Sequence, residues 1–166
     1  PWSASLGGYH FETDGFRENN DLEQSVGSLL VQRRLSADTS VLAEVRATDR
    51  EEGDLVLRAK ELPFPSTGRA SDDSATVRIG LRHDFSPSTT GLALIAYEDV
   101  SLANFSSVGS FRIAQDVDNY TAELQVLHRA VNWSLTSGVR YYGSTVDENT
   151  TLLIPIPDPP FEIPVQ

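Results

Sequence analysis

A strict alternation of apolar and polar residues over positions 75–85, Ala-Thr-Val-Arg-Ile-Gly-Leu-Arg-His-Asp-Phe, constrains the fold more than any other feature of this sequence. Successive side chains of a β-strand point to opposite faces, so the alternation predicts a long strand with one apolar and one charged face. In a water-soluble β-sandwich the charged face looks at solvent, whereas in a transmembrane barrel it looks into the lumen. The rest of the chain discriminates between these two folds.

The same alternation recurs in pairs of long strands joined by tight turns. We expect hairpins at about residues 22–49, 75–98 and 118–143, with turns centred near residues 37, 88 and 131. Polar segments predict long loops at about 13–21, 50–74, 99–117 and 144–166, the last too rich in proline for a central strand. With a weaker strand at 3–12, the sequence predicts one all-β segment, 1–166, folded as an antiparallel up-and-down meander of about seven strands.

The composition excludes several classes of protein. A net charge of −11 argues against a nucleic-acid partner, because clustered Lys and Arg are needed to neutralise phosphates. The chain has no cysteine, which excludes disulfides and thiolate metal sites. No apolar run approaches the roughly 18 residues of a membrane helix. The chain has no methionine and no signal segment, so we expect it to be a piece of a longer polypeptide.

Tight turns at one end of the strands and long acidic loops at the other are typical of an outer-membrane barrel. In that setting the charged phase lines the lumen, because a lipid-facing arginine at mid-bilayer costs about 2–4 kcal/mol. Such a lining selects anionic or sugar-like solutes; alternatively, its charges pair across neighbouring strands and only fill the lumen. The predicted pore-lining residues are Glu44, Arg46, Arg78, Arg82, Glu123, Arg129 and Arg140.

The opposite phase of the same strands is apolar and is expected to face lipid. Aromatic residues near the strand ends are expected to form girdles at the membrane interfaces. The predicted lipid-facing residues are Val41, Val45, Val77, Ile79, Leu81, Leu124, Val126, Leu135 and Val139, and the predicted girdle residues are Tyr97, Tyr120, Trp133 and Tyr141.

Catalytic and metal-binding signals are weak, so we predict no enzyme, no cofactor and no metal site. The three histidines have no second ligand at metal spacing, and His83 and His128 share the apolar phase near the turns, which favours an interfacial position. The acidic segment 49–54 lacks the alternating ligands of a calcium loop and indicates a solvated loop. A Ser-His-Asp site stays open as an alternative, because serines are too common here to single one out.

Two turn segments resemble the strand-turn-strand units of bacterial outer-membrane β-barrel proteins. They are Leu35-Ser-Ala-Asp-Thr-Ser-Val-Leu-Ala-Glu-Val-Arg, and Phe85-Ser-Pro-Ser-Thr-Thr-Gly-Leu-Ala after Arg-Ile-Gly-Leu-Arg-His. The segment Thr13-Asp-Gly-Phe-Arg-Glu-Asn-Asn-Asp-Leu-Glu-Gln is similar to a loop in the barrel part of outer-membrane proteins that carry tetratricopeptide repeats upstream.

This resemblance spans roughly residues 3–143. It implies a Gram-negative-type outer membrane, a porin-like or export role, and partners that comprise outer-membrane lipid, the remaining strands and an upstream repeat domain. The sequence departs from complete barrels of this kind at its proline-rich end and in its odd strand count, so we expect a partial transmembrane barrel. The alternative is a soluble secreted β-sandwich that binds carbohydrate or protein through its loops.

Overall fold

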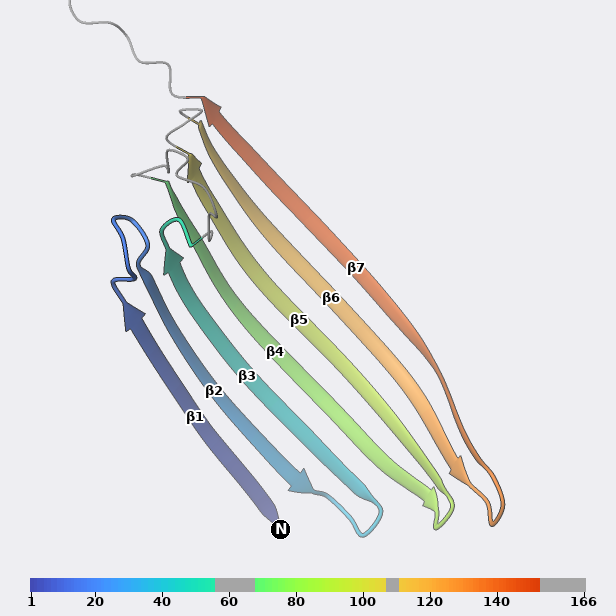
Figure 1. The fold of residues 1–166 in the computed structure, drawn as a ribbon. Helices are drawn as coiled ribbons and strands as arrows, with labels where there is room; N and C mark the ends of the chain where they lie inside the picture. Colours follow the sequence, from blue (N-terminus) through green and yellow to red (C-terminus); the bar gives the residue numbers. More distant parts are fainter. Residues whose placement is uncertain (56–67, 107–110, 153–166) are drawn as a thin grey trace, which may run out of the picture.

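A computed structural model describes residues 1–55, 68–106 and 111–152 of the chain. They form a single antiparallel sheet in which sequential strands are neighbours, in the order β1 to β7 (Figure 1). The predicted all-β, seven-stranded antiparallel meander is confirmed. Among the described residues β1 pairs only with β2 and β7 only with β6, so the sheet is open. The strands are β1 (Trp2–Thr13), β2 (Leu22–Arg34), β3 (Thr39–Glu52), β4 (Arg69–Ser86), β5 (Thr89–Ser106), β6 (Phe111–Arg129) and β7 (Ser134–Leu152).

The strands are longer than the sequence predicted, and the loops correspondingly shorter. β4 and β5 have 18 residues each, and β6 and β7 have 19. Residues 50–52, 69–74, 99–106, 111–117 and 144–152, which we expected in loops, lie in strands. The remaining centres of those three expected loops, 56–67, 107–110 and 153–166, lie outside the described residues. Only residues 107–110 separate β5 from β6, so that connection is no longer than the tight turns.

Cross-strand pairing explains this error. Ser, Asn and Asp have low intrinsic strand propensity, which made these segments look like loops. In the sheet, these residues extend the backbone pairing of the apolar residues next to them in the same strand. Some also form side-chain hydrogen bonds across strands. The Ser101 hydroxyl donates to Asp116 Oδ1 at 2.8 Å across the β5–β6 pair.

The three tight turns lie where the sequence placed them, and we call this end of the sheet the turn end. They comprise residues 35–38, 87–88 and 130–133. Leu35 N donates to Thr39 O at 2.9 Å in the first turn, and Ala130 N donates to Trp133 O at 2.8 Å in the third.

The opposite, loop end carries a compact set of contacts between two connections that are far apart in sequence. Residues 14–21 lie against residues 53–54, and we call this arrangement the loop clasp. Asp54 N donates to Asn19 O at 2.6 Å, and Gly53 N donates to Asp21 O at 2.9 Å. The Asn20 amide donates to Asp54 O at 2.8 Å, and Asn20 is only 5% exposed. These bonds satisfy backbone groups that no strand pairs.

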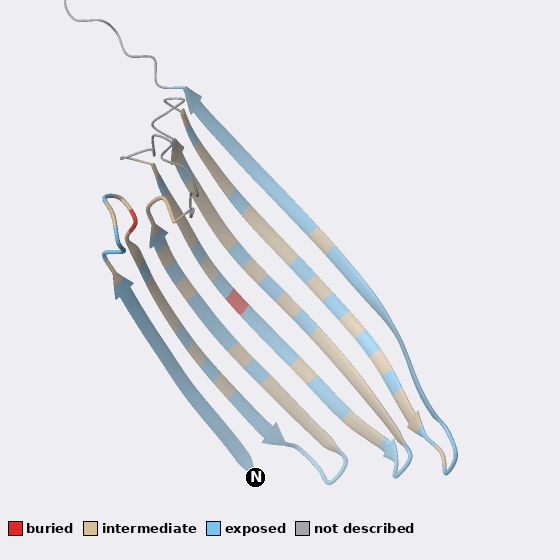
Figure 2. Cartoon of the chain, in the orientation of Figure 1, coloured by how far each residue is buried: buried red, intermediate tan, exposed pale blue. Residues whose placement is uncertain are grey.

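No apolar side chain is buried among the described residues; the only buried residues there are Asn20 and Thr76. Burial instead alternates between exposed and intermediate along much of β2 to β6, whereas the edge strands β1 and β7 are almost entirely exposed (Figure 2). The described part is therefore a single layer without a core of its own.

The loop clasp predicts that Gly53 tolerates no side chain. A Cβ at Gly53 would lie 2.4 Å from Asn19 O, which is backbone and cannot rotate away. We expect Gly53→Ala to lower the free energy of unfolding by about 1–3 kcal/mol, because the clasp must shift to admit the methyl group. Equilibrium urea unfolding measures this. Gly27→Ala is the matched control, since nothing lies within 4 Å of a Cβ there; equal effects at both glycines would contradict the clasp.

Candidate functional site

The candidate site is the sheet itself, because its register sorts side chains onto two chemically different faces. We call the face that carries Val77 the apolar face and the one that carries Arg78 the polar face. Pairing sets Val77 opposite Val45 and Tyr97, and Arg78 opposite Glu44 and Ala96. Followed through all strands, the register places every predicted pore-lining residue on the polar face and every predicted lipid-facing residue on the apolar face.

The apolar face has a continuous hydrophobic surface in its turn-end half, which we call the apolar band. Its central members are largely exposed, for example Ile95 at 58% and Leu124 at 59%. β6 advances eight residues from Tyr120 to His128 across the band, which is about 27 Å along the strand. The band consists of three rows: Leu6, Leu29, Val45, Val77, Tyr97 and Tyr120; Ala4, Val31, Ala43, Ile79, Ile95, Ala122 and Tyr141; and Trp2, Val41, Leu81, Ala93, Leu124 and Val139, the last row being interrupted in β2 by Arg33.

Tyrosines border the band on the side of the loop end. Tyr97 and Tyr120 are directly opposite each other, with ring centroids 5.2 Å apart, and Tyr141 lies one row nearer the turns. We expected these residues near strand ends, and for all three tyrosines this is wrong, because β5, β6 and β7 continue well beyond them.

Aromatic and imidazole rings border the band at the turn end. His83 accepts or donates a bond with the Thr39 hydroxyl at 2.8 Å, and its ring packs edge-on against Phe85 at 4.7 Å. His128 repeats the arrangement with the Thr89 hydroxyl at 2.9 Å and with the Trp133 ring at 5.0 Å. Phe85 was not among the predicted girdle residues. The repeated His and Thr around the turns was a usable signal for this border.

The apolar face changes from hydrophobic to acidic beyond the tyrosines. Carboxylates occupy its next three rows and lie directly opposite one another, as in Asp49 with Asp73 and Asp99 with Asp118. The polar face is mixed in this part of the sheet: one row carries Val26, Val100, Val117 and Val146, and the next two combine Leu102 and Ile113 with the charged residues Arg50, Glu52, Asp72 and Glu148. The members of the acidic rows are Glu12, Glu23, Asp49, Glu51, Asp73, Asp99, Asp116, Asp118 and Asp147.

The polar face carries cross-strand ion pairs in its turn-end half. Arg78 Nη1 lies 3.6 Å from Glu44 Oε2, and Arg140 Nη2 lies 2.6 Å from Glu123 Oε2. Arg82 pairs along its own strand with Asp84 at 3.1 Å. Part of the predicted lining is therefore neutralised by neighbours. Within residues 1–55, 68–106 and 111–152, Arg46 and Arg129 have no carboxylate oxygen within 4.0 Å.

A hydrogen-bonded chain crosses four strands next to these pairs. The Thr76 hydroxyl donates to Glu98 at 3.4 Å, the Asn119 amide donates to Glu98 at 3.1 Å, and the Tyr142 hydroxyl donates to Asn119 at 2.8 Å. Thr76 is 8% exposed. Tyr142 was not predicted as a site residue, because its hydrogen-bond partner Asn119 lies 23 positions away in the sequence.

Burial shows which way the sheet curves. The Glu123 side chain is only 13% exposed, whereas its apolar-face neighbour Leu124 is 59% exposed. Side chains crowd on the concave side of a curved sheet, so the difference indicates curvature toward the polar face. The apolar residues are thus on the more open side, the reverse of a water-soluble protein.

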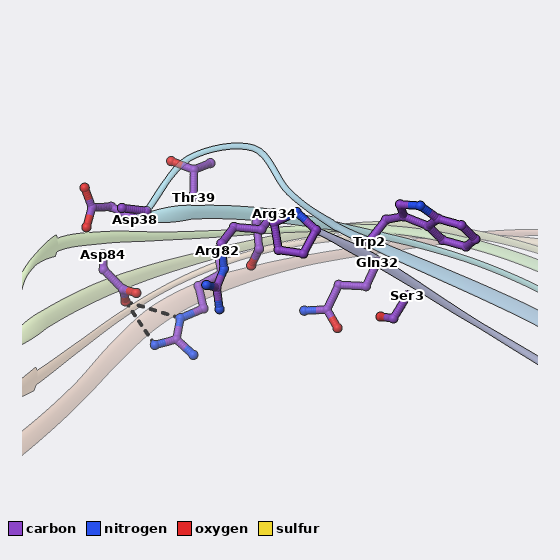
Figure 3. A pocket seen from close by; sticks show the side chains of 11 residues that line it. Trp2, Ser3, Gln32, Arg34, Asp38, Thr39, Arg82 and Asp84 are labelled. Atoms are coloured by element: carbon purple, nitrogen blue, oxygen red, sulfur yellow. Dashed lines mark hydrogen bonds and ion pairs between the residues drawn. The ribbon is translucent and has the colours of Figure 1, made fainter.

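Two of the hollows on the polar face near the turn end differ in their lining. One, of about 400 Å³, is lined by Gln32, Arg34, Arg82 and Asp84 among others. Figure 3 shows Gln32, Arg82 and Asp84 on one side of the sheet and the Trp2 ring on the other. Guanidinium and amide donors of this kind suit carboxylate, phosphate or sugar oxygens. The second hollow, of about 340 Å³, lies around Gly80 and is walled by leucines that interrupt the predicted charged phase, Leu42, Leu92 and Leu94.

The structure also bears on the alternative of a catalytic Ser-His-Asp site. His10 Nδ1 lies 3.0 Å from Ser25 Oγ, and Asp49 follows Ser25 in the same row. A Ser-His-Asp triad needs the carboxylate on the histidine, and here it lies beside the serine. No group of three or more His, Asp or Glu within the described ranges is arranged to hold a metal ion.

A scan against family models and searches of curated proteins and of solved structures found no match. No helix in the part of the chain that the structure describes has the length and apolarity needed to cross a membrane.

Repulsion between facing carboxylates predicts that the acidic rows lower stability. We expect Asp49→Asn to raise the free energy of unfolding by about 0.2–1 kcal/mol, because Asp73 lies directly opposite. The same substitution in an Asp73→Asn background is the control and should gain nothing, since the repulsion is already gone. Urea unfolding at low and high salt measures both. A loss of stability for the single variant would contradict the row assignment.

The ion pair between Arg69 and Asp21, near the loop clasp, predicts a pH-dependent contribution to the stability of the fold. Arg69 donates two hydrogen bonds to Asp21, and they lower the pKa of that carboxyl below its ordinary value. A depressed folded-state pKa contributes stability above the unfolded pKa, and this contribution is lost as the pH falls through the folded value. We expect Arg69→Gln to raise the pKa of Asp21 in an NMR titration, while Arg129→Gln, at the far end, leaves it unchanged. An Asp21 pKa insensitive to Arg69→Gln would exclude the pair.

Proposed function

We propose that this chain forms seven strands of an outer-membrane β-barrel that acts as a channel or an export pore, without catalysis. The observation that carries the proposal is the change of the apolar face at its tyrosines. Between the tyrosines and the turn end this face is hydrophobic, and between the tyrosines and the loop end it is acidic, while the polar face carries charged residues in both halves.

Lipid is the surrounding that fits the turn-end half of the apolar face. Contiguous exposed apolar surface on a monomeric soluble protein is rarely larger than a few hundred Å², and here it extends over all seven strands. With strands tilted by about 40°, the 27 Å path along β6 corresponds to roughly 20 Å of membrane thickness, close to the apolar belt of such barrels. Aromatic side chains at both borders match the interfacial girdles.

Water is the surrounding that fits the loop-end half of the apolar face, where the acidic rows lie. Facing carboxylates such as Asp99 and Asp118 need solvation, so the hydrocarbon ends near the Tyr97–Tyr120 pair. A membrane-spanning strand needs only about 9–11 residues. The 18 residues of β5 therefore cross the bilayer and continue beyond it. In this part the acidic rows face outward, and the polar face combines valines with charged residues.

The polar face then lines the lumen. Arg34 and Arg82 at the turn-end hollow favour anionic or sugar-like solutes, as do Arg46 and Arg129, which have no carboxylate oxygen within 4.0 Å among the residues that the structure describes. The acidic loop end faces the outside of a Gram-negative-type cell. Its partners are outer-membrane lipid, the remaining strands of the barrel and, by the resemblance of residues 13–24, an upstream repeat domain of the parent protein.

Matched leucine substitutions test the proposal in the intact parent protein. Leu124 lies in the apolar band, whereas Leu94 lies on the polar face directly opposite Glu123. We expect Leu124→Arg to impair insertion, at a cost of about 2–4 kcal/mol, and Leu94→Arg to insert normally and alter conductance. Cell fractionation, with gel mobility before and after heating, reports location and barrel folding.

Equal tolerance of both variants would overturn the face assignment. A soluble parent protein whose mobility does not change on heating would overturn the proposal itself. That outcome would favour the secreted β-sandwich, in which the apolar band packs against a second sheet, and glycan or protein binding would be the activity to measure.

A further inference from the structure

We propose that the hollow around Gly80 on the polar face binds an aliphatic carboxylate. The hydrocarbon chain lies against the leucines of the hollow, and the carboxylate lies between Arg34 and Arg82. The proposal rests on the proposed function for its setting in a lumen, and it deepens that function by naming an amphiphilic class of solute. The charges of the polar face alone do not predict the hydrocarbon part.

The hollow is a gap in a row of side chains on the polar face. In that row Gly80 lies between Leu42 on β3 and Leu94 on β5, and Leu92 lies in the neighbouring row. All three leucines are half-buried, and they wall a space of about 340 Å³. Small-molecule sites have volumes of this order and are lined mostly by apolar side chains. The wall therefore suits a hydrocarbon group.

The backbone conformation does not require a glycine at position 80. The φ of Gly80 lies outside the left-handed region, and a Cβ there would meet Leu42 Cδ2 at 3.6 Å, an ordinary van der Waals distance. Glycine inside a strand is less favourable than alanine, because it loses more conformational entropy on folding and packs no side chain. The sheet could thus hold a side chain at this position, and its packing does not explain the empty space.

Two arginines lie beside the leucines, where the carboxylate of the ligand would be. Arg34 and Arg82 lie on the two strands next to Ser40 and are both directly opposite it. Ser40 and Arg82 line the hollow around Gly80 and also the neighbouring hollow, which Arg34 lines as well. Figure 3 shows that Arg82 is bonded to Asp84, whereas Arg34 has no carboxylate oxygen within 4.0 Å in the part of the chain that the structure describes. An anionic group next to Ser40 can therefore pair with Arg34.

The carboxylates nearby are already bonded and do not favour a cation. Glu123 is the only carboxylate among the described residues that line the hollow around Gly80, and it accepts a hydrogen bond from Arg140 Nη2 at 2.6 Å. Asp84, in the neighbouring hollow, accepts a bond from the Thr90 hydroxyl at 2.6 Å in addition to those from its arginine. Asp38 belongs to the first turn and lines only that neighbouring hollow. The charge that is left without a partner beside the leucines is positive.

A sugar and a wholly apolar molecule each match only one part of the site. The leucines offer no partner for the hydroxyl groups of a sugar, and burying such groups without hydrogen bonds is costly. A wholly apolar molecule would leave the charge of Arg34 unused and would have to reach the site through water. An aliphatic carboxylate matches both parts, because each methylene group that leaves water favours binding.

Octanoate and butyrate are the probes, added to the intact parent protein in lipid nanodiscs. Leucine-methyl NMR reports binding at the hollow. We expect octanoate to shift the methyl signals of Leu42, Leu92 and Leu94 and to bind at least about 10-fold more tightly than butyrate, since each half-buried methylene group contributes about twofold. The methyl signals of Leu124, on the apolar face, are the control for octanoate that dissolves in the lipid.

Substitutions separate the two parts of the site. Gly80→Leu fills the hollow, and we expect it to lower the affinity for octanoate to that for butyrate. Ala96→Leu adds the same side chain two residues beyond Leu94 on β5 and should change neither affinity. Gly80→Ala, which the space admits, should cause a smaller loss and tests the hollow if Gly80→Leu does not fold. Arg34→Gln should weaken both carboxylates by a similar factor of about fivefold.

Equal affinities for octanoate and butyrate, or an octanoate affinity that the filled hollow does not change, would overturn the inference. Contacts between the three leucine methyls and another segment of the parent chain would also overturn it, because protein would then cover the hollow. Conductance in planar bilayers is measured separately. A conducting protein that does not distinguish the two carboxylates would contradict the inference alone, whereas octanoate binding by a protein that does not conduct would contradict the proposed function and leave the binding site standing.

Discussion

The continuous antiparallel ladder is the interaction on which the rest of this structure depends. Six strand pairs keep their register over their full length, with one irregularity between Asp84 and Ser86 next to the second turn. Because the side-chain period of a strand is two, a one-residue slip would exchange the two faces of a strand. The unbroken register therefore turns a local alternation such as that of residues 75–85 into an apolar band that extends over all seven strands.

A single-layer sheet has no interior, so each of its two faces contacts surroundings outside the sheet. The sheet curves toward the polar face, where Glu123 and Thr76 are shielded by their neighbours while Leu124 stays open. Ion pairs on that face are partly exposed, and each contributes only about 0–1 kcal/mol. The larger free energy lies in the apolar band, which stabilises the protein only when something apolar covers it. In the proposed barrel, that covering ends near the Tyr97–Tyr120 pair, beyond which the apolar face is acidic.

The sequence was sufficient for local features and insufficient for those set by distant contacts. The turns, the strand count and the two phases follow from period two and from turn residues, and all three agree with the structure. The ends of the strands do not, because Asp99, Ser101 and their neighbours extend the sheet only through pairing with β6. The loop clasp joins residues 14–21 to residues 53–54, which are far apart in sequence, and no pattern in either segment predicts the contact. The alternation also gives no indication that Leu42, Leu92 and Leu94 gather on the polar face around Gly80, where they wall an apolar hollow.

The measurement that tests the central claim most directly is a spin-label scan of β5 in the intact parent protein in bilayers, over successive single-cysteine variants from Leu92 to Ser101. The account predicts that lipid-soluble oxygen reaches labels at Ala93, Ile95 and Tyr97 and not those between them. From Asp99 onward, a water-soluble nickel reagent should reach the same face. Uniform access of the nickel reagent along β5, or an oxygen signal that continues past Asp99, would contradict the account.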